Sequence, residues 1–156
     1  MILSEILKRN AEKYSDKLAL IYEDKALTYK KFNEHVNRVS NGLLRLGMKR
    51  GDRIAVLSDN CFPFYELQWA CLKTGIIWQE INPLSIQPAE GVAFQINNTG
   101  AKVLFVKEEI VSPISTFKGI QMVNSLHSQL KEVKKYFSIG PPLDYMESYD
   151  GWISKF

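Results

Sequence analysis

Few residues in this chain have side chains that could act on a substrate. The histidines, His35 and His127, are the natural general bases near neutral pH, and the cysteines, Cys61 and Cys71, are the natural nucleophiles. His35 lies beside the apolar stripe of a helical segment, and His127 lies where periodicity is weak, so a surface position is favoured for each. Cys71 falls on an apolar stripe, which favours a buried structural thiol. The two cysteines form no CxxC pattern and indicate neither a zinc site nor a disulfide framework.

Acidic residues and glycines provide no self-sufficient site either. Asp144, Glu147 and Asp150 are spaced like an acidic face of a helix, but a solvated tail explains them equally well. No two glycines are separated by a single residue, so the dinucleotide fingerprint GxGxxG is absent. There is no Walker-type loop, and no stretch rich in serine, threonine and glycine that would surround a phosphate with backbone N–H groups. The sequence therefore predicts no complete active site.

Composition places the chain among ordinary globular proteins. Of its 156 residues, 46% are hydrophobic and 24% are charged, which excludes a disordered or collagenous chain. The net charge of +3 is too small to indicate a nucleic-acid partner. The basic pairs Lys8-Arg9, Lys30-Lys31 and Lys49-Arg50 are typical of solvated helix faces, with a phosphate-binding patch as the alternative. No apolar run approaches the ~20 residues of a membrane span, and no secretory signal is present, so we expect a cytoplasmic protein.

The elements that would position these residues alternate between strands and helices. Apolar runs bounded by turn residues predict strands at residues 18–22, 26–29, 53–58, 76–83 and 102–106. Apolar residues at helical spacing predict helices at residues 2–14, between Thr28 and Gly47, between Asn60 and Gly75, and at residues 88–97. Strands that alternate with helices through short loops predict an α/β fold with a mainly parallel sheet flanked by helices.

Beyond residue 108 the pattern weakens. Residues 119–123 are interpreted as one more strand and residues 125–137 as a short helix. The aromatic tail has no evident core of its own: Tyr145, Tyr149, Trp152 and Phe156. Together with an open sheet edge, these side chains predict an unfinished surface that needs a partner or leads to self-association. A tail that folds back over the sheet is the alternative.

An ordered series of short motifs resembles a known family. Leu27-Thr28-Tyr29-Lys30-Lys31-Phe32 is similar to the first core motif of the AMP-forming adenylating enzymes, which include acyl-CoA synthetases, luciferases and peptide-synthetase adenylation domains. The series continues in order with Lys49-Arg50-Gly51-Asp52-Arg53-Ile54-Ala55-Val56, Asp59-Asn60, Leu72-Lys73-Thr74-Gly75, Ile81-Asn82-Pro83 and Gly100-Ala101-Lys102-Val103-Leu104-Phe105. The match covers about residues 3–107. Residues 1–156 are therefore identified as an incomplete N-terminal segment of the family's large domain, with 108–156 only weakly assigned.

The resemblance implies scaffold roles for the matching residues. They end helices, make tight turns or end a strand, and none is expected to be catalytic or to bind a cofactor or metal: Leu27, Thr28, Tyr29, Gly47, Gly51, Asp52, Asn60, Gly75, Asn82 and Pro83. The family's phosphate loop, adenine-binding motif, acidic ribose ligand and catalytic lysine come later in its sequence and are absent here.

Three features depart from the family pattern. Lys31 stands where the first motif usually has glutamate, and Trp78 and Glu80 occupy a strand that is normally small and aliphatic. Residues 84–87 contain no basic residue, whereas many acyl-CoA synthetases carry one there that faces CoA. We therefore expect no CoA contact from this loop.

The resemblance implies the N-terminal portion of an AMP-forming acyl-CoA synthetase, as used in fatty acid metabolism. Such an enzyme converts a carboxylate, ATP and CoA into acyl-CoA, AMP and pyrophosphate. ATP, Mg²⁺ and CoA would belong to the complete enzyme, and this chain alone is expected to be inactive. Its partner would be the remainder of the ligase or a second copy of itself. Two alternatives stay open, namely a non-catalytic assembly module that pairs with a separately encoded remainder, and an unrelated small α/β nucleotide-binding protein.

Overall fold

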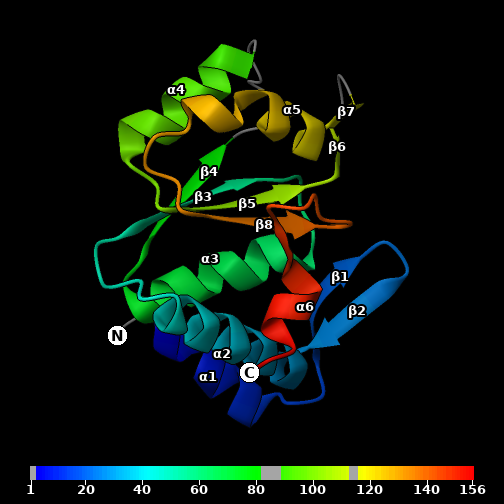
Figure 1. Cartoon of the computed structure of the whole chain (residues 1–156). Coiled ribbons are helices and arrows are strands. Elements are labelled where there is room, and N and C mark those ends of the chain that lie inside the picture. Colours follow the sequence, from blue (N-terminus) through cyan, green and yellow to red (C-terminus); the bar gives the residue numbers. More distant parts are fainter. Residues whose placement is uncertain (1–2, 82–88, 113–115) are drawn as a thin grey trace.

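A central sheet with helices on both faces organises the chain (Figure 1). The computed structural model describes residues 3–81, 89–112 and 116–156. The strands of this sheet lie in the order β4-β3-β5-β8-β9, and each neighbouring pair is parallel. Their bounds are Arg53–Leu57 (β3), Ile77–Ile81 (β4), Val103–Lys107 (β5), Lys135–Ile139 (β8) and Glu147–Ser148 (β9). The α/β class with a mainly parallel sheet is therefore confirmed.

Strand β3 shows why helices cover both faces of the sheet. Ile54 and Val56 belong to one core cluster, Ala55 and Leu57 belong to the other, and all four are fully buried. Such a strand is apolar at every position because successive side chains point to opposite faces. In Figure 1, α2 (Tyr29–Arg45) and α3 (Phe62–Thr74) lie on the side of the first face, with α1 (Leu3–Lys13) packed on these two helices. Helices α4 (Ala89–Thr99) and α5 (Gly119–Leu126) lie on the side of the second face.

Two small antiparallel hairpins lie outside the main sheet. The first consists of β1 (Leu18–Tyr22) and β2 (Lys25–Thr28), as the sequence predicts. The second, which the sequence analysis missed, consists of β6 (Glu109–Val111) and β7 (Thr116–Lys118).

The segment predicted as a strand at residues 119–123 is helical. Helix α5 runs from Gly119 to Leu126, so that prediction is wrong. Ile120, Val123 and Leu126 recur at helical spacing, and all three are buried against the second face of the sheet. A short apolar run fits either period, and here the contacts of the longer segment decide in favour of the helix.

The helix predicted at residues 125–137 is also wrong. Helix α5 gives way to the short 3-10 helix η2 (His127–Gln129), and the chain then enters β8. Tyr136 and Phe137 in β8 are both buried, on opposite faces of the sheet. Pairing with β5 stabilises this strand, and that long-range contact leaves no mark on local periodicity.

The C-terminal tail is folded back against the sheet. It ends in helix α6 (Tyr149–Ile153), which lies beside α2 and β8 (Figure 1). Tyr149 and Trp152 are 1% and 2% exposed, so the expectation that the tail aromatics have no core is wrong for these two. Phe156 is partly buried against Trp152, and Tyr145 remains exposed. The tail therefore closes part of the first face of the sheet.

Gly47 and Gly75 have φ angles of 82° and 75°, as expected for residues that follow helix ends. Valine at either position is expected to lower the free energy of unfolding by about 1–2 kcal/mol, because a β-branched residue is strained there. The loss should be larger for Gly75→Val, since a Cβ on Gly75 would lie 2.9 Å from Cγ of Arg50, whereas the space around Gly47 is open.

Urea denaturation midpoints measure both losses. Gly151→Ala is a matched control, because a Cβ there meets Ser148 at an ordinary 3.7 Å and no positive φ is involved. Unchanged midpoints in both valine variants would show that these two turns do not require glycine.

Candidate functional site

The first family motif joins the β1–β2 hairpin to α2. Thr28 is the N-cap of α2, and its Oγ1 accepts a hydrogen bond from the backbone N–H of Lys31 at 3.3 Å. The backbone N–H of Tyr29 donates to the carbonyl oxygen of Lys17 at 2.9 Å. Leu27 and Tyr29 pack, partly buried, against the first core cluster. Each of these contacts stabilises local structure.

Asp52 fastens the turn at the amino end of β3. Its Oδ2 accepts a hydrogen bond from the backbone N–H of Lys49 at 2.8 Å, and its Oδ1 accepts one from Nζ of Lys102 at 2.6 Å. These bonds, the one from Lys102 foremost, hold the pKa of Asp52 below its usual range. The adjacent Gly51 has a φ of 86°, and its N–H donates to the carbonyl oxygen of Gly75 at 2.9 Å. Two motif segments thus meet at this end of the sheet.

The motif residues Asn60, Asn82 and Pro83 are not described as neighbours of Gly51, Asp52 and Gly75. Asn60 is exposed in the turn between β3 and α3, at the opposite end of the sheet. Asn82 and Pro83 lie outside the described residues, as does the segment 84–87 that lacks a basic residue. The motif residues that the structure describes therefore form no single site.

Asp59 and Lys107 form an ion pair where the strand order reverses. β4 lies on one side of β3, and β5, the next strand of this sheet along the chain, lies on the other. The carboxyl ends of β3 and β5 therefore flank the position at which open α/β sheets usually bind ligands. Nζ of Lys107 lies 2.5 Å from Oδ1 of Asp59, and Oδ2 of Asp59 accepts a hydrogen bond from the backbone N–H of Val111 at 2.9 Å.

The Asp59–Lys107 ion pair stabilises the structure and is not a reactive group. Burial opposes the charge of Lys107, but its hydrogen bond to Asp59 raises its pKa above the ordinary value. The lysine is therefore held protonated and is unsuited to act as a nucleophile or base. Sequence reasoning missed the pair because its members are 48 residues apart.

A buried carboxylate, Glu66, connects three helices on the first face of the sheet. Glu66 on α3 is 3% exposed. Its Oε1 lies 2.8 Å from Nδ1 of His35 on α2, and its Oε2 accepts a hydrogen bond from the hydroxyl of Tyr149 on α6 at 2.7 Å. The interpretation of His35 as an ordinary surface residue is corrected, because its side chain is only 32% exposed and is bound to Glu66. The sequence signal for Glu66 was an acidic residue within a largely apolar helix.

The charges of this cluster reinforce its geometry. The hydrogen bond to Glu66 raises the pKa of His35, with desolvation acting against it. Burial raises the pKa of Tyr149 well above its usual value, so the phenol stays a hydrogen-bond donor. A carboxylate that orients a histidine occurs in catalytic triads, where the histidine activates a nucleophile. The thiol of Cys61 instead contacts Oγ of Ser58 at 3.4 Å, and burial raises its pKa, which disfavours a reactive thiolate.

The other candidate side chains occupy the positions that the sequence favours. His127 is exposed, with its ring next to those of Tyr136 and Tyr145 at centroid distances of 4.8 and 4.3 Å. Cys71 is 2% exposed, and burial raises its pKa to about 12, as expected of a structural thiol.

The acidic residues of the tail do not form one helical face. Helix α6 begins at Tyr149, so only Asp150 is helical, and Glu147 pairs with Lys155. Within residues 3–81, 89–112 and 116–156, no three histidine, cysteine or acidic side chains are grouped so that they could hold a metal ion. None of the helices formed by these residues is long and apolar enough to cross a membrane.

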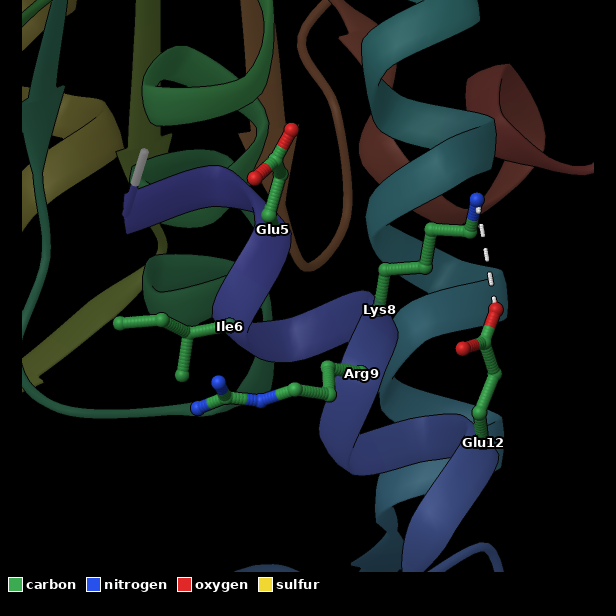
Figure 2. A pocket seen from close by; sticks show the side chains of 5 residues that line it. All are labelled: Glu5, Ile6, Lys8, Arg9 and Glu12. Atoms are coloured by element: carbon green, nitrogen blue, oxygen red, sulfur yellow. Dashed lines mark ion pairs between the residues drawn. The ribbon is translucent and has the colours of Figure 1, made fainter. Parts of the chain in front are cut away.

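Figure 2 shows a shallow hollow along α1. Its lining consists of Glu5, Ile6, Lys8, Arg9 and Glu12, and Lys8 and Glu12 form an ion pair of 4.0 Å one turn apart. All of these residues belong to one helix. A ligand there would be held from one side only, so the hollow offers little means of orienting a substrate.

The sheet and its contacts define a scaffold segment of an α/β enzyme domain. Hydrogen-bonded turns and ion pairs stabilise both ends of the sheet, and the buried carboxylate of Glu66 joins helices α2, α3 and α6. The chain belongs to the AMP-binding enzyme family, whose model matches residues 7–150. The resemblance drawn from the motifs is thereby confirmed.

Similar proteins are much longer than this chain. Bacitracin synthase 2 of Bacillus licheniformis is 26% identical over 147 residues, which cover 94% of this chain and 5% of that protein. The medium-chain acyl-CoA ligase ACSF2 of Rattus norvegicus is 28% identical over 136 residues, which cover 85% of this chain and 20% of that protein. A solved structure from Rhodopseudomonas palustris, assigned as a long-chain-fatty-acid CoA ligase, matches with a TM-score of 0.83 and 26% identity. The match covers 97% of this chain and 36% of that chain. The chain thus spans a minor part of each of these proteins.

Proposed function

We propose that this chain is the N-terminal portion of an AMP-forming acyl-CoA synthetase. The complete enzyme would convert a carboxylate, ATP and CoA into acyl-CoA, AMP and pyrophosphate. The family match over residues 7–150 carries this proposal, and the acyl-CoA ligases among the similar proteins support the substrate class. The similarity to bacitracin synthase 2 favours a second candidate, an adenylation domain of a peptide synthetase.

ATP, Mg²⁺ and CoA would be bound by the complete enzyme in this proposal. The sequence holds no glycine-rich loop to surround a phosphate, and the described residues hold no group of three metal ligands. These two observations support the proposal that the nucleotide and its metal are bound by the complete enzyme. The remainder of the ligase, on the same or a separate chain, would be the partner, and a cytoplasmic location is part of the same proposal.

The purified chain is expected to show no carboxylate-dependent exchange of pyrophosphate into ATP. Catalysis of adenylation depends on charge stabilisation around the transferring phosphates, and this chain lacks the groups for it. The affinity for Mg·ATP, measured by calorimetry, should be weaker than about 1 mM. A complete acyl-CoA ligase assayed in parallel is the positive control, and exchange by the pure chain alone would contradict the proposal.

The DNA that follows the codon for Phe156 distinguishes the alternatives. A Ser/Thr/Gly-rich loop ending in Pro-Lys-Gly, encoded in the same frame, would support a single-chain synthetase. The same loop in a neighbouring reading frame would support an assembly module, and mixing the two purified chains should then produce exchange. Absence of such a loop from both would contradict the proposal, because this family segment would then occur without the phosphate loop.

A further inference from the structure

The end of the main sheet at which its parallel strands begin carries many cationic side chains. In Figure 1 this end lies on the left, where the chain enters β3, β5 and β8. We call it the basic edge, and it consists of Lys49, Arg50, Arg53, Lys102, Lys131, Lys134 and Lys135.

Backbone hydrogen bonds place three of these residues side by side. The N–H of Lys102 donates to the carbonyl oxygen of Arg53 at 2.9 Å, and the N–H of Lys134 donates to the carbonyl oxygen of Lys102 at 2.8 Å. Because neighbouring strands lie about 4.8 Å apart, the three residues form a row across the beginnings of three strands. Lys131 and Lys135, both exposed, flank Lys134 in the chain.

Acidic neighbours do not neutralise the basic edge. In the described loops that precede β3, β5 and β8, the acidic residues are Asp52, which pairs with Lys102, and the exposed Glu132, so the seven cations outnumber these acids. This excess of positive charge is larger than the net charge of +3 of the whole chain. The opposite end of the sheet has the reverse balance, with Asp59, Glu80, Glu108 and Glu109 against Lys107 and Lys118. The molecule is therefore polarised along its strands.

Exposed apolar side chains adjoin the basic edge. Ile77, at the beginning of β4, is 48% exposed and stands opposite Arg53 in the β3–β4 register. Phe94 on α4 is 68% exposed and lines a hollow together with Lys131. Near the end of α3, Leu72 is 43% exposed and lines a groove with two tryptophans, Trp69 and Trp78.

We propose that the basic edge and these apolar side chains bind the anionic phospholipid surface of a membrane, without crossing it. Lysine and arginine near such a surface are attracted by the negative headgroups, and apolar and tryptophan side chains partition into the interfacial layer. A nucleic acid would engage the cations but would gain little from Phe94, Ile77 and Leu72, since its binding is dominated by phosphates. This surface is distinct from the proposed ligase activity and does not depend on it.

The test compares binding of the whole chain to two kinds of vesicle. Cosedimentation is expected with vesicles of phosphatidylcholine and phosphatidylglycerol in equal parts, to weaken with added salt, and to be slight with phosphatidylcholine alone. The triple variant Lys131→Gln, Lys134→Gln, Lys135→Gln should bind the anionic vesicles roughly 100-fold more weakly, from the contribution of each lysine near the surface. Phe94→Ala should also weaken vesicle binding, with the salt dependence unchanged.

The matched control removes three exposed lysines that lie outside the basic edge. Lys25→Gln, Lys30→Gln, Lys31→Gln makes the same change in net charge but lies on the hairpin and the start of α2, so its vesicle binding should stay within about 3-fold of wild type. Equal losses in the two triple variants would overturn the proposal. Tighter binding to heparin or RNA than to vesicles, with no effect of Phe94→Ala, would also overturn it and would indicate a polyanion surface.

Discussion

Glu66→Ala is expected to lower the free energy of unfolding of this chain by about 3 kcal/mol. The substitution removes the acceptor that binds His35 at 2.8 Å and Tyr149 at 2.7 Å. Tyr149 is fully enclosed, so its hydroxyl would be left without its partner in an apolar environment. Urea denaturation followed by tryptophan fluorescence and by circular dichroism measures the loss.

The conservative variant Glu66→Gln separates charge from hydrogen bonding. Its amide oxygen can still accept from the Tyr149 hydroxyl, so the loss should be smaller than for Glu66→Ala. Glu34→Gln is the matched control, because Glu34 is exposed on α2 next to His35 in sequence. A loss for Glu66→Ala no larger than for Glu34→Gln would contradict the structural role assigned to this cluster.

The same cluster provides a second readout, the pH dependence of stability. Because Glu66 raises the pKa of His35 in the folded state, the stabilisation is complete below the unfolded value of about 6.5 and is lost as pH rises through the folded pKa. The free energy of unfolding should therefore decline as pH rises above about 6.5 in wild type, and it should decline much less in Glu66→Gln. Histidine NMR should show His35 titrating at higher pH in wild type than in Glu66→Gln, with Arg38 and Glu34 as lesser influences.

The parallel core was predictable because its signal is local. The strands β3 and β5 are almost continuous runs of Ile, Val, Leu and Phe, and buried parallel strands require such runs. The helix boundaries followed from capping chemistry, with Thr28 at the start of α2 and Gly75 after α3. These features depend on neighbours in sequence, so sequence alone contains them.

The Glu66 cluster could not be predicted because its contacts are long-range. Glu66 is 31 residues from His35 and 83 residues from Tyr149 along the chain. The three residues meet only after α2, α3 and α6 have packed. The acidic Glu66 within the largely apolar α3 is a local signal, but it does not indicate which residues Glu66 contacts. Helix α5 was missed for a related reason. A short apolar run fits either a strand or a helix, and here its packing against the second face of the sheet decides the conformation.

The basic edge was likewise invisible in sequence. Its members come from the loops before β3, β5 and β8 and from the first residues of β3 and β8, so they stand in three groups about 30 or more residues apart. Considered singly, Lys49-Arg50 resembles any solvated basic pair. A parallel sheet brings the beginnings of its strands to one edge, and this topology gathers the charges.

Trp152→Ala is expected to lower the free energy of unfolding by about 3–5 kcal/mol, the largest single loss proposed for the chain. Trp152 is 2% exposed, and its ring centroid lies 4.7 Å from that of Phe137 and 5.6 Å from that of Phe105. Removing it would open a cavity between α6 and the sheet. Urea denaturation measures the loss, and a variant as stable as wild type would show that the tail does not seal this face.

Gly42→Ala tests the same packing through the sign of its effect. In an isolated helix alanine is more stable than glycine by about 1 kcal/mol. In this structure a Cβ on Gly42 would lie 2.5 Å from Cζ2 of Trp152 and 3.0 Å from Cε2 of Phe156, so α6 would have to shift. Gly42→Ala should therefore destabilise wild type by about 1–3 kcal/mol and be clearly less unfavourable in the Trp152→Ala variant, where the ring is absent and Phe156 alone must move. Stabilisation in both backgrounds would mean that α6 does not rest on α2.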